Sequence, residues 1–288
     1  MISLKDVETF DDISSATFLE KYKKPELPVV MKNLTKEWKA KKLWSLEYFE
    51  ALAGDKEVKL YGTKSSRDKK MLYDEQTTMP LKVYFELLRS GENDLRMFFF
   101  EILKEIPSLK DDFAFPEIGL KFFKKLPTMF FGGKGASVQM HFDIDYADIF
   151  LCHFGGNKRV ILFSPDQTPN MYHVPYSFSS LYGVNYVQPD YEKHPALKEL
   201  SGYETLLKHG DVLYIPPGWW HYIEYEDIGY SMALRALPRR PKNILKMLKN
   251  VFWIRHVETF MRKRFAEKWT DRNEKLAVKY THSNLEKN

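Results

Sequence analysis

Short β-rich runs separated by tight turns fill residues 127–238, and this pattern limits the possible folds more than any other feature of the chain. The runs include "TMFFGGKG", "ADIFLCHFGG", "KRVILFSP" and "GDVLYIPPGWW". Gly-Gly, Ser-Pro and Pro-Pro-Gly mark the turns between them. Many short strands joined in this way are typical of an antiparallel sandwich or barrel. The sequence therefore predicts a mainly β domain with flanking helices.

The flanking regions have a different pattern. Residues 1–126 mix helical segments such as "WSLEYFEALAG" with short strands such as "LPVVMKN", and residues 239–288 form a basic helical tail around the barrel at 127–238. Apolar residues in the tail follow steps of three and four, which predicts an amphipathic helix. This apolar stripe has to be buried against the barrel or against a second copy of the chain. It comprises Met247, Val251, Ile254, Val257, Met261, Phe265 and Trp269.

The composition is that of an ordinary globular protein. The 288 residues are 44% hydrophobic and 29% charged, and no apolar run approaches the roughly 20 residues of a membrane helix. The N-terminus has acids where a signal peptide needs a basic end and an apolar stretch. The one cysteine, Cys152, fits a reducing compartment. We therefore expect a cytoplasmic protein that does not span a membrane.

Positive charge is concentrated in the tail. Residues 239–288 contain 14 Lys and Arg against 5 Asp and Glu, a net charge of +9, whereas the rest of the chain carries −4. Such an asymmetry can mark a surface for nucleic acid, an acidic protein or a membrane. The alternative is a solvated helix face with no partner.

Two polar stretches interrupt the β region. In "QMHFDIDYADIF", strand alternation would place His141, Asp143 and Asp145 on one face. In "GDVLYIPPGWWHYIEY", His221 begins a strand among aromatic residues. A solvated face and a hydrogen-bonded core histidine would explain these residues separately. Together they supply the two histidines and one carboxylate of a non-haem Fe(II) site, which Zn, Mn or Ni could also occupy.

The same two stretches resemble a known family. "HFDIDYADIFLCHFGGNKRVILFSPDQ" followed by "GDVLYIPPGWWHYIEY" is similar to the JmjC/cupin-like family of Fe(II)- and 2-oxoglutarate-dependent oxygenases. The branch it resembles contains the hypoxia-inducible factor asparaginyl hydroxylase and the tRNA wybutosine hydroxylase. The resemblance implies a double-stranded β-helix, also called a cupin or jelly-roll barrel. Flanking helices and a C-terminal helical dimerisation segment would accompany it.

Site residues follow from this resemblance. It implies that His141, Asp143 and His221 bind the metal and that Lys158 holds the distal carboxylate of 2-oxoglutarate. Ser137 and Arg235 lie near two further co-substrate positions of the family.

Some positions depart from the family pattern. Val138 and Ala147 replace a threonine and an asparagine that are usual in the family, and the tyrosine that supports the lysine has no clear counterpart near Phe98. Arg235 could instead pair with Asp145 or Asp148. These departures leave the predicted metal ligands intact but alter the predicted co-substrate pocket.

The resemblance also implies an activity. We expect a dioxygenase that uses Fe(II), 2-oxoglutarate and dioxygen to hydroxylate a C–H bond, first of all in a protein side chain. Because the tail is basic, a nucleoside of tRNA or another RNA is the alternative substrate. A third reading is a non-catalytic cupin that binds a metal as a sensor or binding module. We also expect a homodimer formed through the C-terminal helices.

Overall fold

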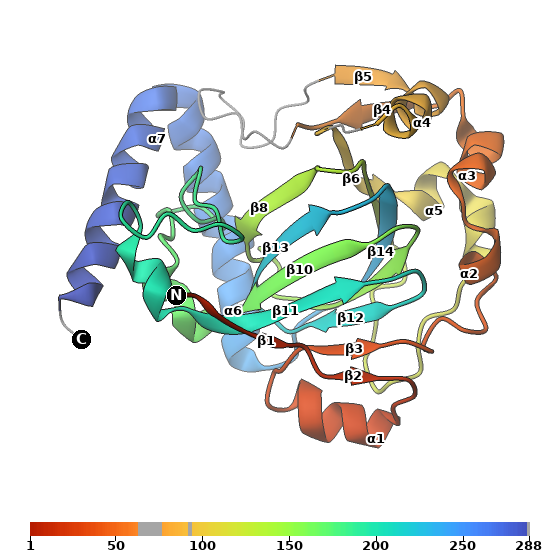
Figure 1. Cartoon of the computed structure of the whole chain (residues 1–288), viewed down its shortest axis with the longest axis horizontal. Coiled ribbons are helices and arrows are strands. Elements are labelled where there is room, and N and C mark those ends of the chain that lie inside the picture. The colour runs from red at the N-terminus through yellow and green to blue at the C-terminus, as the bar shows by residue number, and fades with distance from the viewer. Residues whose placement is uncertain (63–76, 92–93, 287–288) are drawn as a thin grey trace.

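The computed structural model describes residues 1–62, 77–91 and 94–286. Its described strands form two large sheets stacked at the centre of the molecule and one small hairpin (Figure 1). The larger sheet has the order β2-β3-β12-β9-β14-β7-β6, and the five-stranded sheet has the order β1-β11-β10-β13-β8. This arrangement is the predicted jelly-roll barrel, so the expected fold class is confirmed.

The strands are short, as the sequence predicted. Those of the larger sheet are β2 (Thr9–Phe10), β3 (Val29–Met31), β6 (Arg96–Glu101), β7 (Thr128–Gly132), β9 (Asp148–Phe154), β12 (Val212–Ile215) and β14 (Gly229–Ala236). Those of the five-stranded sheet are β1 (Ser3–Asp6), β8 (Ser137–His141), β10 (Lys158–Phe163), β11 (Ser201–Leu207) and β13 (Trp220–Tyr225). The hairpin consists of β4 (Glu57–Leu60) and β5 (Thr77–Pro80). Strands from the N-terminal region therefore extend both sheets of the barrel.

The two faces of strand β9 explain its continuous apolar run. Ile149 and Leu151 point into the core between the sheets, together with Val160 and Leu162 of β10. Phe150, on the other face, packs in the core between the larger sheet and the N-terminal helices. A strand buried on both faces needs apolar residues at successive positions, which is why "DIFLCHF" does not alternate.

Helices of the N-terminal region cover the outer face of the larger sheet. They are α1 (Ser15–Phe18), α2 (Lys39–Leu43), α3 (Leu46–Ala53), α4 (Leu81–Arg89) and α5 (Ile102–Glu105), with the π-helical turn η1 (Leu19–Lys23) and the 3-10 turn η2 (Pro107–Asp111). The helix predicted from "WSLEYFEALAG" is α3. Its N-cap, Ser45, accepts a hydrogen bond from the backbone of Tyr48 at 3.1 Å. Phe49 of this helix packs edge-on against Phe131 of the sheet.

The segment between β10 and β11 lies against the end of β8. It contains two 3-10 turns, η3 (Pro165–Asn170) and η4 (Pro195–Glu199). The backbone N–H of Phe142 donates to Phe178, and the backbone N–H of Ser180 donates to Met140. This long connection therefore runs alongside the strand that carries His141.

Three helical elements end the chain: α6 (Pro241–Lys249), the π-helical turn η5 (Asn250–Ile254) and α7 (Arg255–Leu285). Helix α7 bends sharply at Ala266 and turns back on itself, so its two arms lie side by side in Figure 1. Glu258 accepts hydrogen bonds from Arg262 and from Trp269 of the other arm, both at 2.6 Å. No helix in the described ranges is both long and apolar enough to cross a membrane.

The predicted apolar stripe is only partly buried. Val251, Ile254, Val257 and Met261 are half-buried. A second apolar face is left exposed: Leu245 is 67% accessible, Phe252 67%, Trp253 63% and Phe260 66%. The tail thus presents large apolar side chains among its basic residues.

Candidate metal centre

Strands β8 and β13 bring two predicted ligands together. The strands pair antiparallel, and His221 stands directly opposite His141 in their register. Side chains at directly opposed positions of two strands lie on the same face and in contact. The two imidazole rings accordingly lie with their centroids 4.1 Å apart and their planes inclined by 55°.

Asp143 joins the histidines from a turn. The sequence predicted a continuous strand through residues 139–150, but β8 ends at His141 and β9 begins at Asp148. In between, the backbone N–H of Tyr146 donates to Asp143, Asp145 caps the N–H of Ala147, and Tyr146 has a positive φ of 49°. The continuous strand is therefore wrong, because local side-chain and backbone hydrogen bonds turn the chain here. Asp143 nevertheless lies beside His141, as expected, but through this turn and not through strand alternation.

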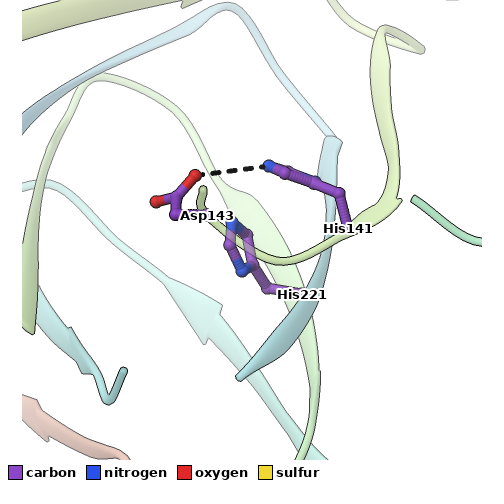
Figure 2. Close-up of side chains that lie close together, drawn as sticks. All are labelled: His141, Asp143 and His221. Carbon is purple, nitrogen blue, oxygen red and sulfur yellow. Dashed lines mark ion pairs between the residues drawn. The ribbon is translucent and has the colours of Figure 1, made fainter. Parts of the chain in front are cut away.

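The three side chains converge on one point. One ligand atom from each of His141, Asp143 and His221 lies within 4.8 Å of the others. His141 Nε2 is 3.9 Å from Asp143 Oδ1, the contact marked by the dashed line in Figure 2. Among the described residues, no other group of histidine, cysteine and carboxylate side chains has this spacing.

Each histidine is oriented through its other ring nitrogen. His141 Nδ1 lies 2.8 Å from the carbonyl oxygen of Gln139, and His221 Nδ1 lies 3.1 Å from that of Trp219. Each Nδ1 therefore carries the proton and donates it, which leaves the Nε2 lone pair free for a metal ion. This donor set, two neutral imidazoles and one carboxylate, fits Fe(II) and other divalent transition metals.

Burial and neighbouring charges together set the protonation states of the three groups. Burial and the neighbouring His221 lower the pKa of His141 to about 3, and burial also lowers the pKa of His221. Burial alone would raise the pKa of Asp143, but Arg235 and the two histidines hold this pKa at about 2. At neutral pH the site consists of two neutral imidazoles and an ionised carboxylate, the protonation states that metal ligands require.

Arg235 belongs to the same cluster. It lies on β14, and its Nη1 contacts Asp143 Oδ2 at 3.1 Å and Asp145 Oδ2 at 3.0 Å. The ion pair between Arg235 and Asp145, one of the alternatives expected from the sequence, is therefore present. Asp148, the other alternative, instead pairs with Lys23 at 2.9 Å.

Lys158 is fully buried inside the barrel. Its ammonium donates a hydrogen bond to the hydroxyl of Ser231. It also lies over the ring of Tyr225, 4.2 Å from the centroid. Ser231 and Arg235 occupy alternate positions of β14, so both face the barrel interior.

Sequence reasoning missed the groups that support Lys158. Tyr225 lies four residues after His221 on the same strand, so strand alternation could have placed both on one face. His153 lies in the apolar run of β9, where the sequence gives no sign of such a role. Its Nδ1 lies 3.0 Å from Ser231 Oγ, and its Nε2 lies 3.3 Å from the carbonyl oxygen of Gly156. These contacts form a directed chain, in which Lys158 donates to Ser231 and Ser231 donates to His153.

Ser137 is not brought into this group. It stands opposite Glu224 at the start of β8, and its side chain hydrogen-bonds Tyr222. Tyr222 lies on the opposite face of β13 from His221. The geometry therefore gives no support to a co-substrate contact by Ser137.

Comparison with known proteins places these features in a family. A model of the cupin-like domain matches residues 15–257. Jumonji C domain-containing protein 5 of Drosophila melanogaster is 27% identical over 238 residues, which cover 79% of this chain and 59% of the relative. tRNA wybutosine-synthesizing protein 5 of Gallus gallus is 29% identical over 252 residues, which cover 78% of this chain and 75% of the relative. Lysine-specific demethylase 8 of Xenopus tropicalis is 28% identical over 228 residues, which cover 75% of this chain and 49% of the relative.

A jelly-roll barrel that gathers two histidines and an aspartate is typical of metal-dependent cupin proteins. The chain belongs to the cupin-like domain family, and its relatives connect it to the JmjC group within that family. Members of this group use Fe(II) and 2-oxoglutarate, and most are oxygenases. The chain spans between 49% and 75% of the length of the three relatives described above.

Proposed function

We propose that the protein is an Fe(II)- and 2-oxoglutarate-dependent dioxygenase that hydroxylates a C–H bond. The observation that carries this proposal is the convergence of His141, Asp143 and His221 to within 4.8 Å inside a barrel that also holds the buried Lys158. Three ligands on one side of an octahedral ion leave three positions open. A bidentate 2-oxo acid needs two of these and dioxygen needs one.

Each residue has a defined role in this proposal. His141 and His221 present Nε2 to the metal, and Asp143 presents a carboxylate oxygen. Lys158, desolvated in the barrel, binds the distal carboxylate of 2-oxoglutarate through a charge-assisted hydrogen bond. The apolar core between the sheets excludes water from the co-substrate. These residues bind and orient the co-substrate and keep competing reactions out of the site.

A metal held by His141, Asp143 and His221 would activate dioxygen, which is the oxidant, while the protein residues orient the reactants. One oxygen atom of dioxygen enters the C–H bond of the substrate, and the other enters 2-oxoglutarate, which becomes succinate and carbon dioxide. Atoms and electrons balance in this scheme because the co-substrate is oxidised together with the substrate.

Anaerobic titration tests the proposal directly. Adding Fe(II) and then 2-oxoglutarate to the purified protein should give the weak visible charge-transfer absorption of a 2-oxo acid bound to iron. His141→Ala should abolish both iron binding and the absorption, whereas His256→Ala, at an exposed position in the tail, should change neither. Unchanged iron binding in His141→Ala would overturn the site assignment.

For the substrate we propose a protein side chain first. A relative named lysine-specific demethylase supports a protein substrate, and relatives named tRNA wybutosine-synthesizing protein support RNA as the alternative. The charge of +9 in residues 239–288 also favours RNA. Release of carbon dioxide from 2-oxoglutarate, stimulated either by peptides or by tRNA, separates the two. Binding to RNA should also weaken steeply with salt.

A non-catalytic metal-binding cupin is the second candidate. The directed chain from Lys158 through Ser231 to His153 argues against it, because a buried ammonium is costly unless it serves a bound anion. Iron binding without any 2-oxoglutarate absorption would favour this second candidate over an oxygenase.

We also propose a homodimer that buries the exposed apolar face of the C-terminal helices. Phe252, Trp253 and Phe260 are each more than half exposed. Exposed apolar patches of this kind mark interaction sites in soluble proteins.

A further inference from the structure

A second carboxylate, that of Asp145, lies next to the candidate metal site but is not one of its three predicted ligands. Asp143 and Asp145 are two residues apart in the turn between β8 and β9, and both contact the same nitrogen atom, Nη1 of Arg235. They are therefore immediate neighbours and offer four carboxylate oxygens in total. A divalent cation close to one of these groups would attract the other as well.

Arg235 engages three of the four oxygens. Its Nη1 lies 3.1 Å from Asp143 Oδ2, 3.2 Å from Asp145 Oδ1 and 3.0 Å from Asp145 Oδ2. The fourth oxygen, Asp143 Oδ1, is the one that faces His141 Nε2. Three carboxylate oxygens are therefore bound by Arg235, and one, Asp143 Oδ1, is directed toward the histidines.

Burial holds this arrangement in place. The side chain of Arg235 is 10% exposed, and those of Asp143 and Asp145 are about one fifth exposed. Ion pairs with little solvent around them are weakly screened. Removing one partner leaves an uncompensated charge, and binding a new partner of opposite charge then becomes favourable. For Asp145 without Arg235, a metal ion in the same cluster would be that partner.

We propose that Arg235 acts as a positioning residue that keeps Asp145 off the metal and limits Asp143 to one coordinating oxygen. This inference rests on the proposed metal site formed by His141, Asp143 and His221. Its consequence is that three coordination positions stay open. A second carboxylate ligand would take a position that 2-oxoglutarate or dioxygen needs.

Substitution of Arg235 by methionine tests the inference, because methionine is unbranched and long but carries no charge. The first readout needs no catalysis: Co(II) affinity, measured by competition with a chromophoric chelator, together with the Co(II) absorption spectrum, which reports coordination geometry. Arg235→Met should bind Co(II) more tightly, on the order of tenfold, the scale on which groups around the ligands alter metal affinity. Its spectrum should also change.

The second readout is the affinity of the Co(II)-loaded protein for 2-oxoglutarate. Arg235→Met should weaken it by on the order of tenfold or more, because Asp145 now occupies an open position. The double variant Arg235→Met/Asp145→Asn should return the spectrum and the 2-oxoglutarate affinity toward those of the wild type. Asp145→Asn alone is the matched control and should leave both close to the wild type. Circular dichroism and thermal melting identify any variant that fails to fold.

Three outcomes would overturn the inference. One is an unchanged Co(II) spectrum in a folded Arg235→Met protein. Another is weaker 2-oxoglutarate binding that Asp145→Asn does not rescue, which would make Arg235 a direct anchor for the co-substrate. The third is Co(II) affinity that falls in Arg235→Met. Failure of the wild-type protein to bind Co(II) would instead reject the proposed metal site itself.

Discussion

The ammonium of Lys158 lies over the ring of Tyr225, 4.2 Å from the ring centroid, in the interior of the barrel. The two residues face each other across strands β10 and β13, where Lys158 is directly paired with Tyr225. The negative face of an aromatic ring attracts a cation, and more strongly where water is excluded. Tyr225 therefore supports the lysine through its ring face. In the proposed co-substrate pocket this contact would take the place of the tyrosine that is usual in the family.

Replacing Lys158 should separate co-substrate binding from metal binding. In Lys158→Met we expect the 2-oxoglutarate requirement to rise by roughly two orders of magnitude, the size of effect seen when one partner of a buried charged pair is removed. Iron affinity should stay the same, because Lys158 does not contact the ligands. Equilibrium titration of each ligand measures both effects. Arg159→Met, next in sequence but paired with Glu204 near the surface, is the control. An unchanged 2-oxoglutarate requirement in Lys158→Met would indicate that Arg235, and not Lys158, binds the distal carboxylate of the co-substrate.

The affinity for 2-oxoglutarate should depend on pH through Lys158. Burial lowers the pKa of Lys158 to about 7 from its ordinary value of 10.5. The groups around it are the Ser231 hydroxyl, the Tyr225 ring and His153, whose pKa burial also lowers, so His153 is neutral. A bound carboxylate stabilises the charged lysine and raises its pKa. Binding should therefore take up a proton above pH 7, and affinity should fall as pH rises through this range.

Calorimetry in two buffers with different ionisation enthalpies measures this proton uptake. At about pH 8 the apparent binding enthalpy should differ between the buffers, and Lys158→Met should remove that difference. Equal enthalpies for the wild-type protein would show that the lysine is already charged before the co-substrate binds.

Removing the Ser231 hydroxyl should disturb both of its neighbours. In Ser231→Ala, Lys158 loses a hydrogen-bond acceptor and His153 Nδ1 loses a donor. We expect the free energy of unfolding to fall by about 1–3 kcal/mol, the cost of leaving a buried polar group unsatisfied. Urea denaturation measures this change. Ser231→Thr keeps the hydroxyl and serves as the control, so an equal loss in both variants would point to packing instead.

Charge introduced into the exposed apolar face should dissociate the proposed dimer. Trp253 and Phe252 are both more than 60% exposed, so Trp253→Glu or Phe252→Glu should fold normally. Light scattering coupled to size-exclusion chromatography should then report monomers at concentrations where the wild type is dimeric. Phe123→Glu, at an exposed apolar position elsewhere, is the control. A dimer that persists in both tail variants would place the interface on another surface.

Local patterns were sufficient to predict a mainly β architecture with flanking helices, whereas the meeting of the two histidines was predicted through the family resemblance. The short strands and turns of residues 127–238 indicate an antiparallel sandwich or barrel, because each strand has to bury at least one apolar face. His141 and His221 come together because "SVQMH" and "WHYIEY" form neighbouring strands in that barrel. The family resemblance provided this pairing, since the strand order cannot be obtained from alternation alone.

The remaining parts of the site depend on turns and long-range contacts. Asp143 lies in a turn that the polar side chains of residues 143–147 create, so its position does not follow from strand alternation. The contact between Ser231 and His153 joins residues 78 positions apart, and the contacts of Arg235 with the two aspartates span about 90. The first contact arises from the register of β9 and β14, and the second from the turn before β9; no local pattern specifies either.

The connection between β10 and β11 has a consequence for how a polypeptide can reach the metal. It pairs with β8 beside His141, where Ser180 donates to Met140 and Phe142 donates to Phe178. An unpaired edge strand can accept an incoming peptide as an additional strand, but the backbone groups of β8 are already occupied at this point. A polypeptide therefore cannot extend the sheet next to His141 without displacing residues 178–180. The protein substrate proposed above would then reach the metal site through a side chain and not by pairing its backbone with β8 at this point.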